Sequence, residues 1–448
     1  MGCSAPCGKV FLTAPLRQHS TTTKQTIMYA LVDCNNFFVS CERLFRPDLE
    51  GKAVVVLSNN DGCAVSRSNE AKRLGIRMGQ PYFEFAHLEQ EGKVTVFSSN
   101  YILYGDISRR VQSVLHEASP DVEVYSIDES FLLIDEQMAG GDLDRWAKAL
   151  SARCKRLTGI PVGVGVAPTK TLAKIASKLC KQYPALRGGC YMHREEDIRK
   201  VLSKFPLEDV WGIGRRYFAR FSALGMHTAA DFAARSAEWV RREMGVGGVR
   251  TWRELQGVPC IELEHPQPRQ SICCSRSFAK EITDPNDLQG QLSTFVAMAT
   301  EKLRKQHSAA REATVFIRTN RHRTDLPQHY DSRLITFATP TDDTMIIGKA
   351  AAEALREMIR KDVGYKKAGI ILSNFCPRNQ VQADLFDHTD HERSARLMKA
   401  IDAINATHGA GRVHIATQAK EGINMNRQHL SPAYTSSWSD IIVVNADK

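Results

Sequence analysis

The sequence predicts a multidomain α+β protein, and three features support this prediction. The chain has 448 residues, 43% of them hydrophobic and 25% charged, which is ordinary for folded domains and excludes wholesale disorder. At roughly 150 residues per domain, this length suggests about three domains. Strand-like apolar runs alternate with helical spacing of apolar residues, and a proline-punctuated stretch separates two such regions.

The first region is predicted to contain short buried strands and amphipathic helices. Asp33 closes the first strand-like run, and Asp128, Glu129 and Ser130 are expected to form the polar centre of a hairpin. The predicted strands cover residues 29–33, 53–57, 124–127, 131–134 and 162–166, and the predicted helices cover residues 101–116, 143–157 and 169–181.

The rest of the chain divides at glycine and proline signals. Short helices with glycine turns are expected from about residue 206 to about residue 257, and Pro259, Pro266 and Pro268 then indicate an inter-domain linker. A polar tail follows Pro377. Strands at residues 313–317 and 369–372 and helices at residues 287–306 and 345–361 are predicted for the second mixed domain, at about residues 272–375.

Charge and cysteine content restrict the class of protein. The 60 Lys and Arg residues exceed the 50 Asp and Glu residues by 10, so a polyanion is the first partner to consider, either a nucleic acid or an anionic membrane surface. No apolar run approaches the ~18 residues of a membrane span, and we expect no membrane-spanning segment. The twelve cysteines include no Cys-x-x-Cys pair, which favours reduced thiols in a cytoplasmic protein over a zinc site or a disulfide scaffold.

Three carboxylates occupy positions that suit a metal site. Asp33 ends one predicted strand, while Asp128 and Glu129 lie between two others, so rigid elements would hold all three. Mg²⁺ binds through a few carboxylates together with substrate phosphates, and two ions about 3.5–4 Å apart can promote a phosphoryl displacement. The alternative is that Asp33 caps a helix and Asp128 is an ordinary turn residue.

Basic and aromatic residues near these carboxylates suggest nucleotide binding. Lys72 could contact a triphosphate, as could Lys170 and Lys174 near the start of a predicted helix. The alternative is a solvated basic helix face, which is the usual place of such lysines. Phe37 and Phe38 follow the first strand. Because successive helical residues point about 100° apart, one ring can pack inward while the other faces a site.

Several motifs resemble the signature motifs of Y-family DNA polymerases. They are residues 29–42 (YALVDCNNFFVSCE), 126–130 (SIDES) and 163–177 (GVGVAPTKTLAKIAS), and they occur in the order of the family. Residues 58–67 (SNNDGCAVSR) and 70–79 narrow the resemblance to the UmuC branch, the catalytic subunits of bacterial DNA polymerase V. The similarity runs from residue 28 to the C-terminus.

The resemblance implies a right-hand polymerase with a ferredoxin-like palm, small fingers, a helix-hairpin-helix thumb and a βαβ-type little finger. Residues 1–27 are left as an extension that we expect to be disordered. The implied boundaries are palm 28–44 and 100–195, fingers 45–99, thumb 196–258, linker 259–270, little finger 271–376 and C-terminal tail 377–448.

The resemblance also carries over residue roles at the nucleotide site. Asp33, Asp128 and Glu129 match the catalytic carboxylates that bind two Mg²⁺ ions, with the backbone carbonyl of Cys34 as a further ligand. Phe38 matches the steric gate, whose ring excludes the 2′-hydroxyl of a ribonucleotide, and many relatives have Tyr there. The remaining matches to nucleotide contacts are Phe37, Ser66, Lys72 (Arg in some relatives) and Lys174.

Two regions are predicted to grip DNA. In residues 210–216, Gly212 and Gly214 would bring backbone N–H groups to a phosphate while Arg215 and Arg216 add charge, although a Gly-x-Gly can also be a plain turn. The second candidate group lies in the predicted little finger, where an exposed edge loop is an equal alternative. Its members are Arg276, Arg318, Arg321 and Arg323.

Residues 382–386 (QADLF) form the sharpest short motif of the tail. Gln382 and Asp384 are polar, whereas Leu385 and Phe386 would be exposed in a monomer and therefore predict a hydrophobic pocket on a partner. The motif resembles the peptide by which bacterial polymerases bind the sliding clamp.

The resemblance implies an error-prone translesion DNA polymerase, which adds dNTPs to a primer 3′ end by two-metal phosphoryl transfer during the SOS response to DNA damage. The resemblance implies primer–template DNA, dNTPs, a sliding clamp, a UmuD′-type accessory dimer and a RecA filament as partners. Two alternatives stay open at this point: a two-metal nuclease, and a non-catalytic scaffold tethered to a clamp at stalled forks.

Overall fold

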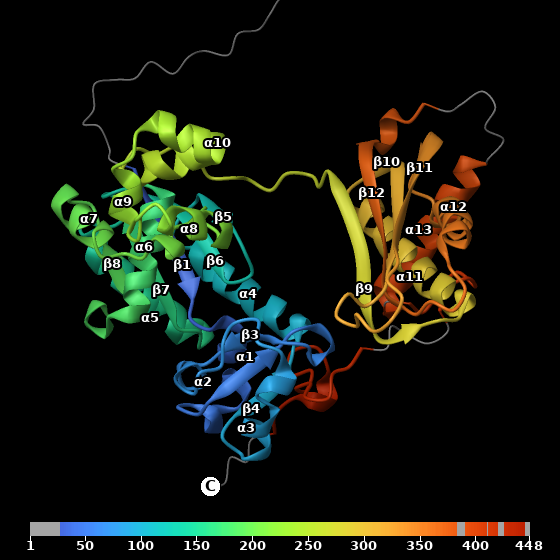
Figure 1. Ribbon diagram of the computed structural model, residues 1–448, viewed down its shortest axis with the longest axis horizontal. Coiled ribbons are helices and arrows are strands. Elements are labelled where there is room, and N and C mark those ends of the chain that lie inside the picture. The colour runs from blue at the N-terminus through green and yellow to red at the C-terminus, as the bar shows by residue number, and fades with distance from the viewer. Residues whose placement is uncertain (1–26, 383–389, 410, 420–424, 444–448) are drawn as a thin grey trace, which may run out of the picture. The chain divides into compact units, whose positions relative to one another are not determined.

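The structure is a computed structural model that describes residues 27–382, 390–409, 411–419 and 425–443 (Figure 1). The chain forms two compact units, each assembled from two separate segments. The first unit comprises Met1–Asn35 and Arg109–Leu263, and the second comprises Asn36–Ser108 and Glu264–Lys448. Each unit is described on its own below.

A five-stranded sheet of order β5-β6-β1-β7-β8 organises the first unit. The central strand β1 pairs antiparallel with both β6 and β7, and helices α5 and α6 pack against the sheet. The elements are β1 (Met28–Cys34), β5 (Val122–Val124), β6 (Glu129–Ile134), α5 (Leu143–Thr158), β7 (Val162–Ala167), α6 (Lys170–Gln182) and β8 (Gly189–Tyr191).

Helix α6 lies unusually close to strand β7 because the strand carries glycines on the face that the helix covers. A Cβ atom at Gly165 would lie 2.1 Å from the backbone nitrogen of Ser177, and one at Gly163 would lie 3.2 Å from the Ser177 carbonyl oxygen. Thr169 caps the helix by accepting a hydrogen bond from the Leu172 amide at 3.2 Å. The glycines therefore set how near the lysines of α6 come to the sheet.

Four helices complete the first unit, and the last of them, at 19 residues, is longer than the short helices predicted after residue 206. Phe221, Phe232 and Val240 are buried among them, and Thr228 and Asp231 form a capping box at the start of α9. Residues 258–270, which include the stretch predicted as a linker, contain no helix or strand. The helices are α7 (Glu195–Leu202), α8 (Arg215–Ser222), α9 (Ala229–Ala233) and α10 (Ala237–Leu255).

The first part of the second unit is built around a three-stranded sheet of order β3-β2-β4. Strand β2 is fully buried, with Val55 and Leu57 in a small core beneath α2 and α3. The boundary between the two units falls inside α4. The elements are α1 (Phe37–Phe45), β2 (Val54–Leu57), β3 (Ala64–Arg67), α2 (Asn69–Arg73), α3 (Ala86–Gln90), β4 (Thr95–Ser98) and α4 (Tyr101–His116).

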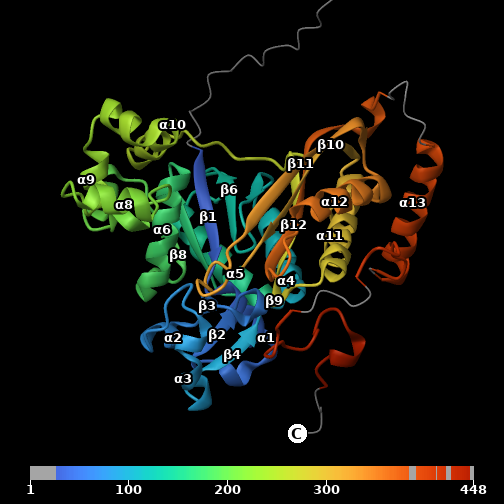
Figure 2. The same cartoon turned by 45° about the vertical axis from the view of Figure 1, so that its right-hand side comes forward.

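The other sheet of the second unit has four antiparallel strands in the order β11-β10-β12-β9. Helices α11 and α12 lie side by side on one of its faces (Figure 2), where Phe295, Val315 and Ile370 are buried. The elements are β9 (Ser271–Ile282), α11 (Pro285–Lys305), β10 (Ser308–Arg318), β11 (Tyr330–Thr341), α12 (Thr344–Met358) and β12 (Tyr365–Pro377).

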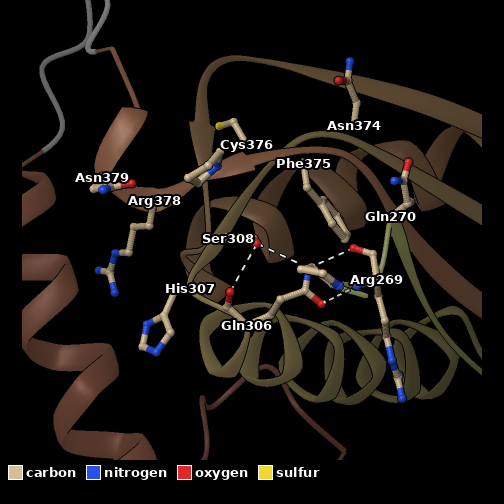
Figure 3. A pocket seen from close by; sticks show the side chains of 12 residues that line it. Arg269, Gln270, Gln306, His307, Ser308, Asn374, Phe375, Cys376, Arg378 and Asn379 are labelled. Carbon is tan, nitrogen blue, oxygen red and sulfur yellow. Dashed lines mark hydrogen bonds between the residues drawn. The ribbon is translucent and has the colours of Figure 1, made fainter. Parts of the chain in front are cut away.

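The linker is joined to this sheet beside a hollow of about 1010 Å³ (Figure 3). Gln306 accepts a hydrogen bond from the Arg269 amide at 2.9 Å and donates one to the Arg269 carbonyl at 2.8 Å. Arg378 donates its amide to the His307 carbonyl at 2.9 Å. None of the site residues predicted above lines this hollow.

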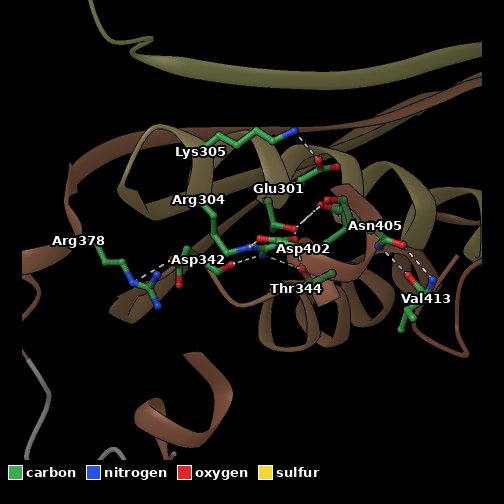
Figure 4. Close-up of polar contacts among 12 residues, drawn as sticks. Glu301, Arg304, Lys305, Asp342, Thr344, Arg378, Asp402, Asn405 and Val413 are labelled. Carbon is green, nitrogen blue, oxygen red and sulfur yellow. Dashed lines mark hydrogen bonds and ion pairs between the residues drawn. The ribbon is translucent and has the colours of Figure 1, made fainter. Parts of the chain in front are cut away.

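A helix that the sequence did not predict follows in the tail, α13 (His391–His408). Arg304 of α11 donates to both carboxylate oxygens of Asp402 at 2.6 and 2.8 Å, and also to Thr344 (Figure 4). The Arg304 side chain is 8% exposed and that of Asp402 is 28% exposed, so the arginine is shielded from water while its partner is partly accessible. Because Met398 is the single buried residue of α13 among those described, its apolar face is too narrow to signal a helix.

The prediction for the first hairpin was partly wrong. Strand β5 ends at Val124, and Glu129 and Ser130 belong to β6 rather than to the turn. Their pairing with Asp33 and Val32 of β1 outweighs the local turn preference. Within the described residues, ten cysteines are free thiols and no helix combines the length and apolar character needed to span a membrane.

Candidate active site

The three predicted acidic residues lie on adjoining stretches of backbone where β1 and β6 run side by side. Asp33 pairs directly with Glu129 in the antiparallel register, and the Cys34 amide donates to the Asp128 carbonyl at 2.9 Å. Directly opposed residues of antiparallel strands have Cβ atoms about 4.5–5.5 Å apart and point to the same face. The structure therefore brings together acidic residues that lie almost one hundred positions apart in the chain.

The strand register also decides which face of the sheet carries this cluster. Tyr29 and Leu31 alternate with buried residues of the other face and pack in the core formed with α6, and Asp33 continues the same alternation. Glu129 and Phe131 occupy that face on the neighbouring strand. As a result, Asp33 and Glu129 point toward α6, where three lysines follow one another at helical spacing.

Two of those lysines neutralise the cluster. Lys181 lies 2.5 Å from an Asp33 oxygen, and Lys174 donates to both oxygens of Glu129 at 2.8 Å. Asp128 instead accepts the hydroxyl of Ser126 at 2.6 Å. The middle lysine of the series, Lys178, pairs with Asp209 outside the cluster.

The electrostatics of Asp33 reflect this crowding. Burial raises the pKa of the Asp33 carboxyl above its ordinary value, and the neighbouring charges of Glu129 and Asp128 raise it further. The ammonium group of Lys181 opposes this shift. Burial beside these carboxylates also raises the pKa of the Cys34 thiol well above its usual range. Additional positive charge at this site would therefore stabilise the ionised form of the carboxylates.

This arrangement fits Mg²⁺ in its donor chemistry. All three side chains offer oxygen atoms, which hard divalent cations prefer, and their mutual repulsion would be relieved by a cation. In the described part of the chain, no group of three or more His, Cys, Asp or Glu side chains is already arranged as a metal site. Lys174 pairs with Glu129 and Lys181 pairs with Asp33. These ion pairs involve carboxylate oxygens that would bind the metal.

Lys170 does not serve as a triphosphate contact, contrary to one reading of the sequence. Its side chain is 1% exposed and forms an ion pair with Glu123, and its ammonium group also donates to the Glu262 carbonyl at 2.8 Å. A buried lysine needs such partners, and breaking the pair would leave an uncompensated charge. Lys170 is therefore part of the structural framework beneath the site.

Sequence reasoning missed an aromatic enclosure around Lys174. The Lys174 ammonium lies 4.6 Å from the ring centre of Tyr125, 5.3 Å from that of Trp211 and 5.7 Å from that of Phe131. These rings favour a cation and orient it next to Glu129. It also missed Lys181, although the spacing of Lys174, Lys178 and Lys181 on one helix face was a usable signal.

In the second unit, Phe38 belongs to a cluster of aromatic rings. Phe37 is buried whereas Phe38 is half-buried, as expected for successive helical residues. The Phe38 ring stacks on Tyr104 with ring centres 4.4 Å apart and meets Tyr101 edge-on at 5.9 Å. The Phe38 ring is thus held by neighbours from the start of α4.

Ser66 and Lys72 lie around the N-terminal half of α1. The Ser66 hydroxyl accepts a hydrogen bond from the Val39 amide at 3.4 Å, and Ser66 is buried. Lys72 donates to the side chains of Asn36 at 2.8 Å and Asn69 at 3.2 Å. The structure therefore groups Ser66 and Lys72 with the helix that carries Phe38.

The predicted glycine motif forms the turn before α8. Gly212 has a left-handed φ of 91°, and a Cβ atom there would lie 2.8 Å from the Thr251 hydroxyl, so the turn requires glycine on two grounds. Gly214 is the N-cap of α8. Arg215 and Arg216 follow in the first turn and are exposed, which leaves their charges open to solvent.

The predicted little-finger arginines do not share one surface. Arg318 is the last residue of β10 and lies on the sheet face that α11 and α12 leave uncovered. Arg276 lies on the other face, which the two helices cover, and is half-buried. Arg321 and Arg323 are exposed in the following loop, where Arg323 pairs with Asp325 at 2.7 Å.

The clamp-like motif falls mostly outside the described residues. Gln382 is exposed and lies in irregular backbone after β12. Asp384, Leu385 and Phe386 lie outside the residues that the structure describes.

Comparison with known proteins places the chain in a family. The model of the impB/mucB/samB family matches residues 32–178, that of its C-terminal domain matches residues 269–385, and a domain of unknown function (DUF4113) matches residues 395–444. Protein UmuC of Salmonella typhimurium is 41% identical over 93% of this chain and 100% of the relative. Protein ImpB of the same species is 41% identical over 92% and 99%, and DNA polymerase IV of Caulobacter vibrioides is 28% identical over 87% and 93%.

Solved structures show the same fold. A Y-family DNA polymerase chimera of Dbh and Dpo4 aligns with a TM-score of 0.62 at 21% identity, over 78% of this chain and 98% of the other. An insertion ternary complex of Dbh DNA polymerase aligns with a TM-score of 0.53 at 22% identity and the same coverage. The fold is that of a right-hand polymerase, and the chain belongs to the impB/mucB/samB family as a UmuC-type member of the Y-family DNA polymerases.

Proposed function

We propose that this chain is a template-directed translesion DNA polymerase in which Asp33, Asp128 and Glu129 hold two Mg²⁺ ions, with the Cys34 carbonyl as a further ligand. The observation that carries the proposal is the direct pairing of Asp33 with Glu129, next to Asp128, in a chain of this family. Bound Mg²⁺ would activate the primer 3′-hydroxyl and neutralise charge on the leaving pyrophosphate.

The lysines of α6 have two roles in this proposal. Without metal, Lys174 and Lys181 compensate the carboxylates and keep the strand pair stable despite its charge. With substrate present, Lys174 contacts the triphosphate, since an ammonium group retained by three aromatic rings is preorganised for an anion. Lys72 and Ser66 are further proposed triphosphate contacts, because their motif resembles that of the family.

Phe38 is the proposed sugar-selecting ring, next to the buried Phe37. Its half-buried position leaves part of the ring available, while stacking on Tyr104 limits its movement. A rigid ring excludes a 2′-hydroxyl by collision, which requires no hydrogen bond. Asp33 and Phe38 are five residues apart in the chain, so one short segment would serve both metal and sugar.

DNA grip is proposed for the thumb and the little finger. The exposed Gly212–Arg216 turn can present backbone N–H groups and two guanidinium groups to a phosphate without reading bases. Arg318, Arg321 and Arg323 would contact the backbone from the sheet and loop of the little finger, and Arg276, on the opposite face of that sheet from Arg318, would make a separate contact. The proposed domains keep the boundaries of the family: palm 28–44 and 100–195, fingers 45–99, thumb 196–258 and little finger 271–376.

We also propose error-prone synthesis in the SOS response, with a sliding clamp, a UmuD′-type dimer and a RecA filament as partners. The clamp contact rests on residues 382–386, of which Leu385 and Phe386 would enter an apolar pocket. The accessory partners rest on family membership alone. The free thiols of the described residues support a reducing, cytoplasmic setting.

Primer extension tests the proposed reaction. The purified chain is mixed with primer–template DNA, dNTPs and Mg²⁺, alone and with a RecA filament and a cleaved UmuD-type dimer. Template-dependent lengthening of the primer supports a polymerase. Shortening of the DNA would support the nuclease instead. A full biological response with an Asp128→Ala variant would support the non-catalytic scaffold.

A further inference from the structure

The C-terminal segment, residues 425–443, lies within the stretch that matches the domain of unknown function, and it packs against the three-stranded sheet of the second unit. The Ser98 amide of β4 donates to the His429 carbonyl at 2.9 Å, and the His429 amide donates to the Ser98 hydroxyl at 3.1 Å. Asp61 accepts a hydrogen bond from the Gln428 amide at 2.9 Å. The segment therefore extends the polar edge of this sheet.

Further contacts fix the segment to helices α1 and α4. Asn100 donates to the Ser431 hydroxyl at 3.0 Å and to the Pro432 carbonyl at 3.3 Å. The rings of Phe45 and Tyr434 stack almost parallel, with centres 4.4 Å apart. Backbone pairing, buried hydrogen bonds and ring stacking together indicate a specific docking rather than a loose contact.

The docking completes a buried polar centre. Glu42 is fully buried, and one of its carboxylate oxygens accepts hydrogen bonds from the hydroxyl groups of Tyr104 at 2.6 Å and Ser431 at 3.1 Å. Its second oxygen has no hydrogen-bond partner among the described residues. Burial raises the pKa of Glu42 to about 7, so this carboxyl is costly to bury and depends on the two hydroxyl groups.

The same centre leads directly to the proposed gate. Tyr104 is fully buried, and its ring stacks on Phe38 with an angle of 14° between the planes. A continuous series of contacts thus joins Ser431 of the C-terminal segment through Glu42 and Tyr104 to Phe38.

We infer that the C-terminal segment positions the Phe38 ring through the Ser431–Glu42–Tyr104 hydrogen bonds and thereby sharpens the discrimination between deoxyribonucleotides and ribonucleotides. Ser431, Glu42 and Tyr104 are positioning residues, since none of them is proposed to touch the nucleotide. This inference rests on the proposed role of Phe38.

The physical reason lies in the nature of steric selection. A ring that excludes a hydroxyl by collision does so only while it cannot move aside. The Tyr104 ring stacks on one face of the Phe38 ring and restricts its movement. The Tyr104 hydroxyl is anchored by Glu42, which in turn needs Ser431 for its second hydrogen bond. Loss of Ser431 would loosen this anchor and let the two stacked rings move together.

The test measures single-nucleotide incorporation with dNTP and with rNTP, for the full chain and its variants. In Ser431→Ala, rNTP incorporation should rise so that the dNTP/rNTP ratio of kcat/KM falls by roughly three- to tenfold, the effect of about one hydrogen bond. Efficiency with dNTP should stay within about twofold. Ser431→Thr retains a hydroxyl and should restore the ratio, and Ser436→Ala, at an exposed position of the same segment, should leave it unchanged.

Two further variants separate this inference from the gate itself. Phe38→Ala should lower the ratio more than any positioning variant, and no change there would show that the gate assignment is wrong. If Phe38→Ala relaxes selection while Ser431→Ala and Tyr104→Phe do not, the gate stands and the positioning role is overturned. An equal loss with dNTP and rNTP in Ser431→Ala would also overturn it, because that result indicates a purely structural contact.

Discussion

The buried carboxyl of Glu42 predicts a pH-dependent stability for the contact between the C-terminal segment (residues 425–443) and helices α1 and α4 of the second unit. Burial raises its pKa from an ordinary 4.5 to about 7, despite hydrogen bonds from Tyr104 and Ser431 that lower it. A pKa that is higher in the folded state means that the folded protein binds more protons, so stability from this group is present at low pH and is lost as the pH rises toward 7.

The magnitude follows from the size of the shift. Each pKa unit corresponds to about 1.4 kcal/mol, so the native state should lose about 2–3 kcal/mol from this site between pH 5 and pH 8. Glu42→Gln cannot ionise and should lack this loss. The opening constant is the equilibrium constant for transient release of the C-terminal segment. Its ratio between the native protein and the variant should therefore change roughly 30- to 150-fold between the two pH values.

Hydrogen–deuterium exchange of peptides that cover α1 and residues 425–443 measures these opening constants. Comparing the two proteins at the same pH cancels the intrinsic exchange rates away from the substituted residue. Glu50→Gln, at an exposed glutamate of the next segment, is the matched control and should follow the native protein. An identical pH dependence in Glu42→Gln and the native protein would refute the reasoning.

Two further predictions concern the carboxylate cluster and its support. Because Lys181 lowers the pKa of Asp33, Lys181→Met should move the acidic limb of the activity profile at subsaturating Mg²⁺ to higher pH, whereas Lys178→Met should not. An unmoved limb in Lys181→Met would contradict the pairing. Gly165→Ala should destabilise the first unit by roughly 3 kcal/mol in thermal unfolding, because the added Cβ would collide with α6. Gly348→Ala, in open space on α12, should be neutral or stabilising, and equal melting temperatures for both variants would count against the close packing of α6.

The sequence was informative wherever local pattern determines structure. The apolar run that ends at Asp33 predicted the strand observed as β1, and apolar spacing predicted α4 with its observed bounds. Carboxylates at strand ends suggested a common site, and the β1–β6 register brings them together. Tertiary packing determined the rest. Whether Lys170 points to solvent or into an ion pair with Glu123 depends on a partner 47 residues away, which no local pattern specifies.

The missed features share this dependence on distant partners. The role of Lys181 follows from how closely α6 approaches β7, and α13 is stabilised by Arg304 of another helix rather than by its own apolar face. Ser431 is an ordinary polar residue in the sequence, and only its distance to Glu42, 389 positions earlier, gives it a role.

The central claim is that Asp33, Asp128 and Glu129 form the catalytic centre. Primer extension by Asp33→Asn, Asp128→Asn and Glu129→Gln measures this most directly, with DNA binding followed in parallel and Mg²⁺ raised stepwise. The account predicts that each variant still binds primer–template DNA but loses at least about 100-fold in extension rate, as expected when a carboxylate needed to hold a catalytic metal is removed. Extension at the native rate by any of the three would contradict it.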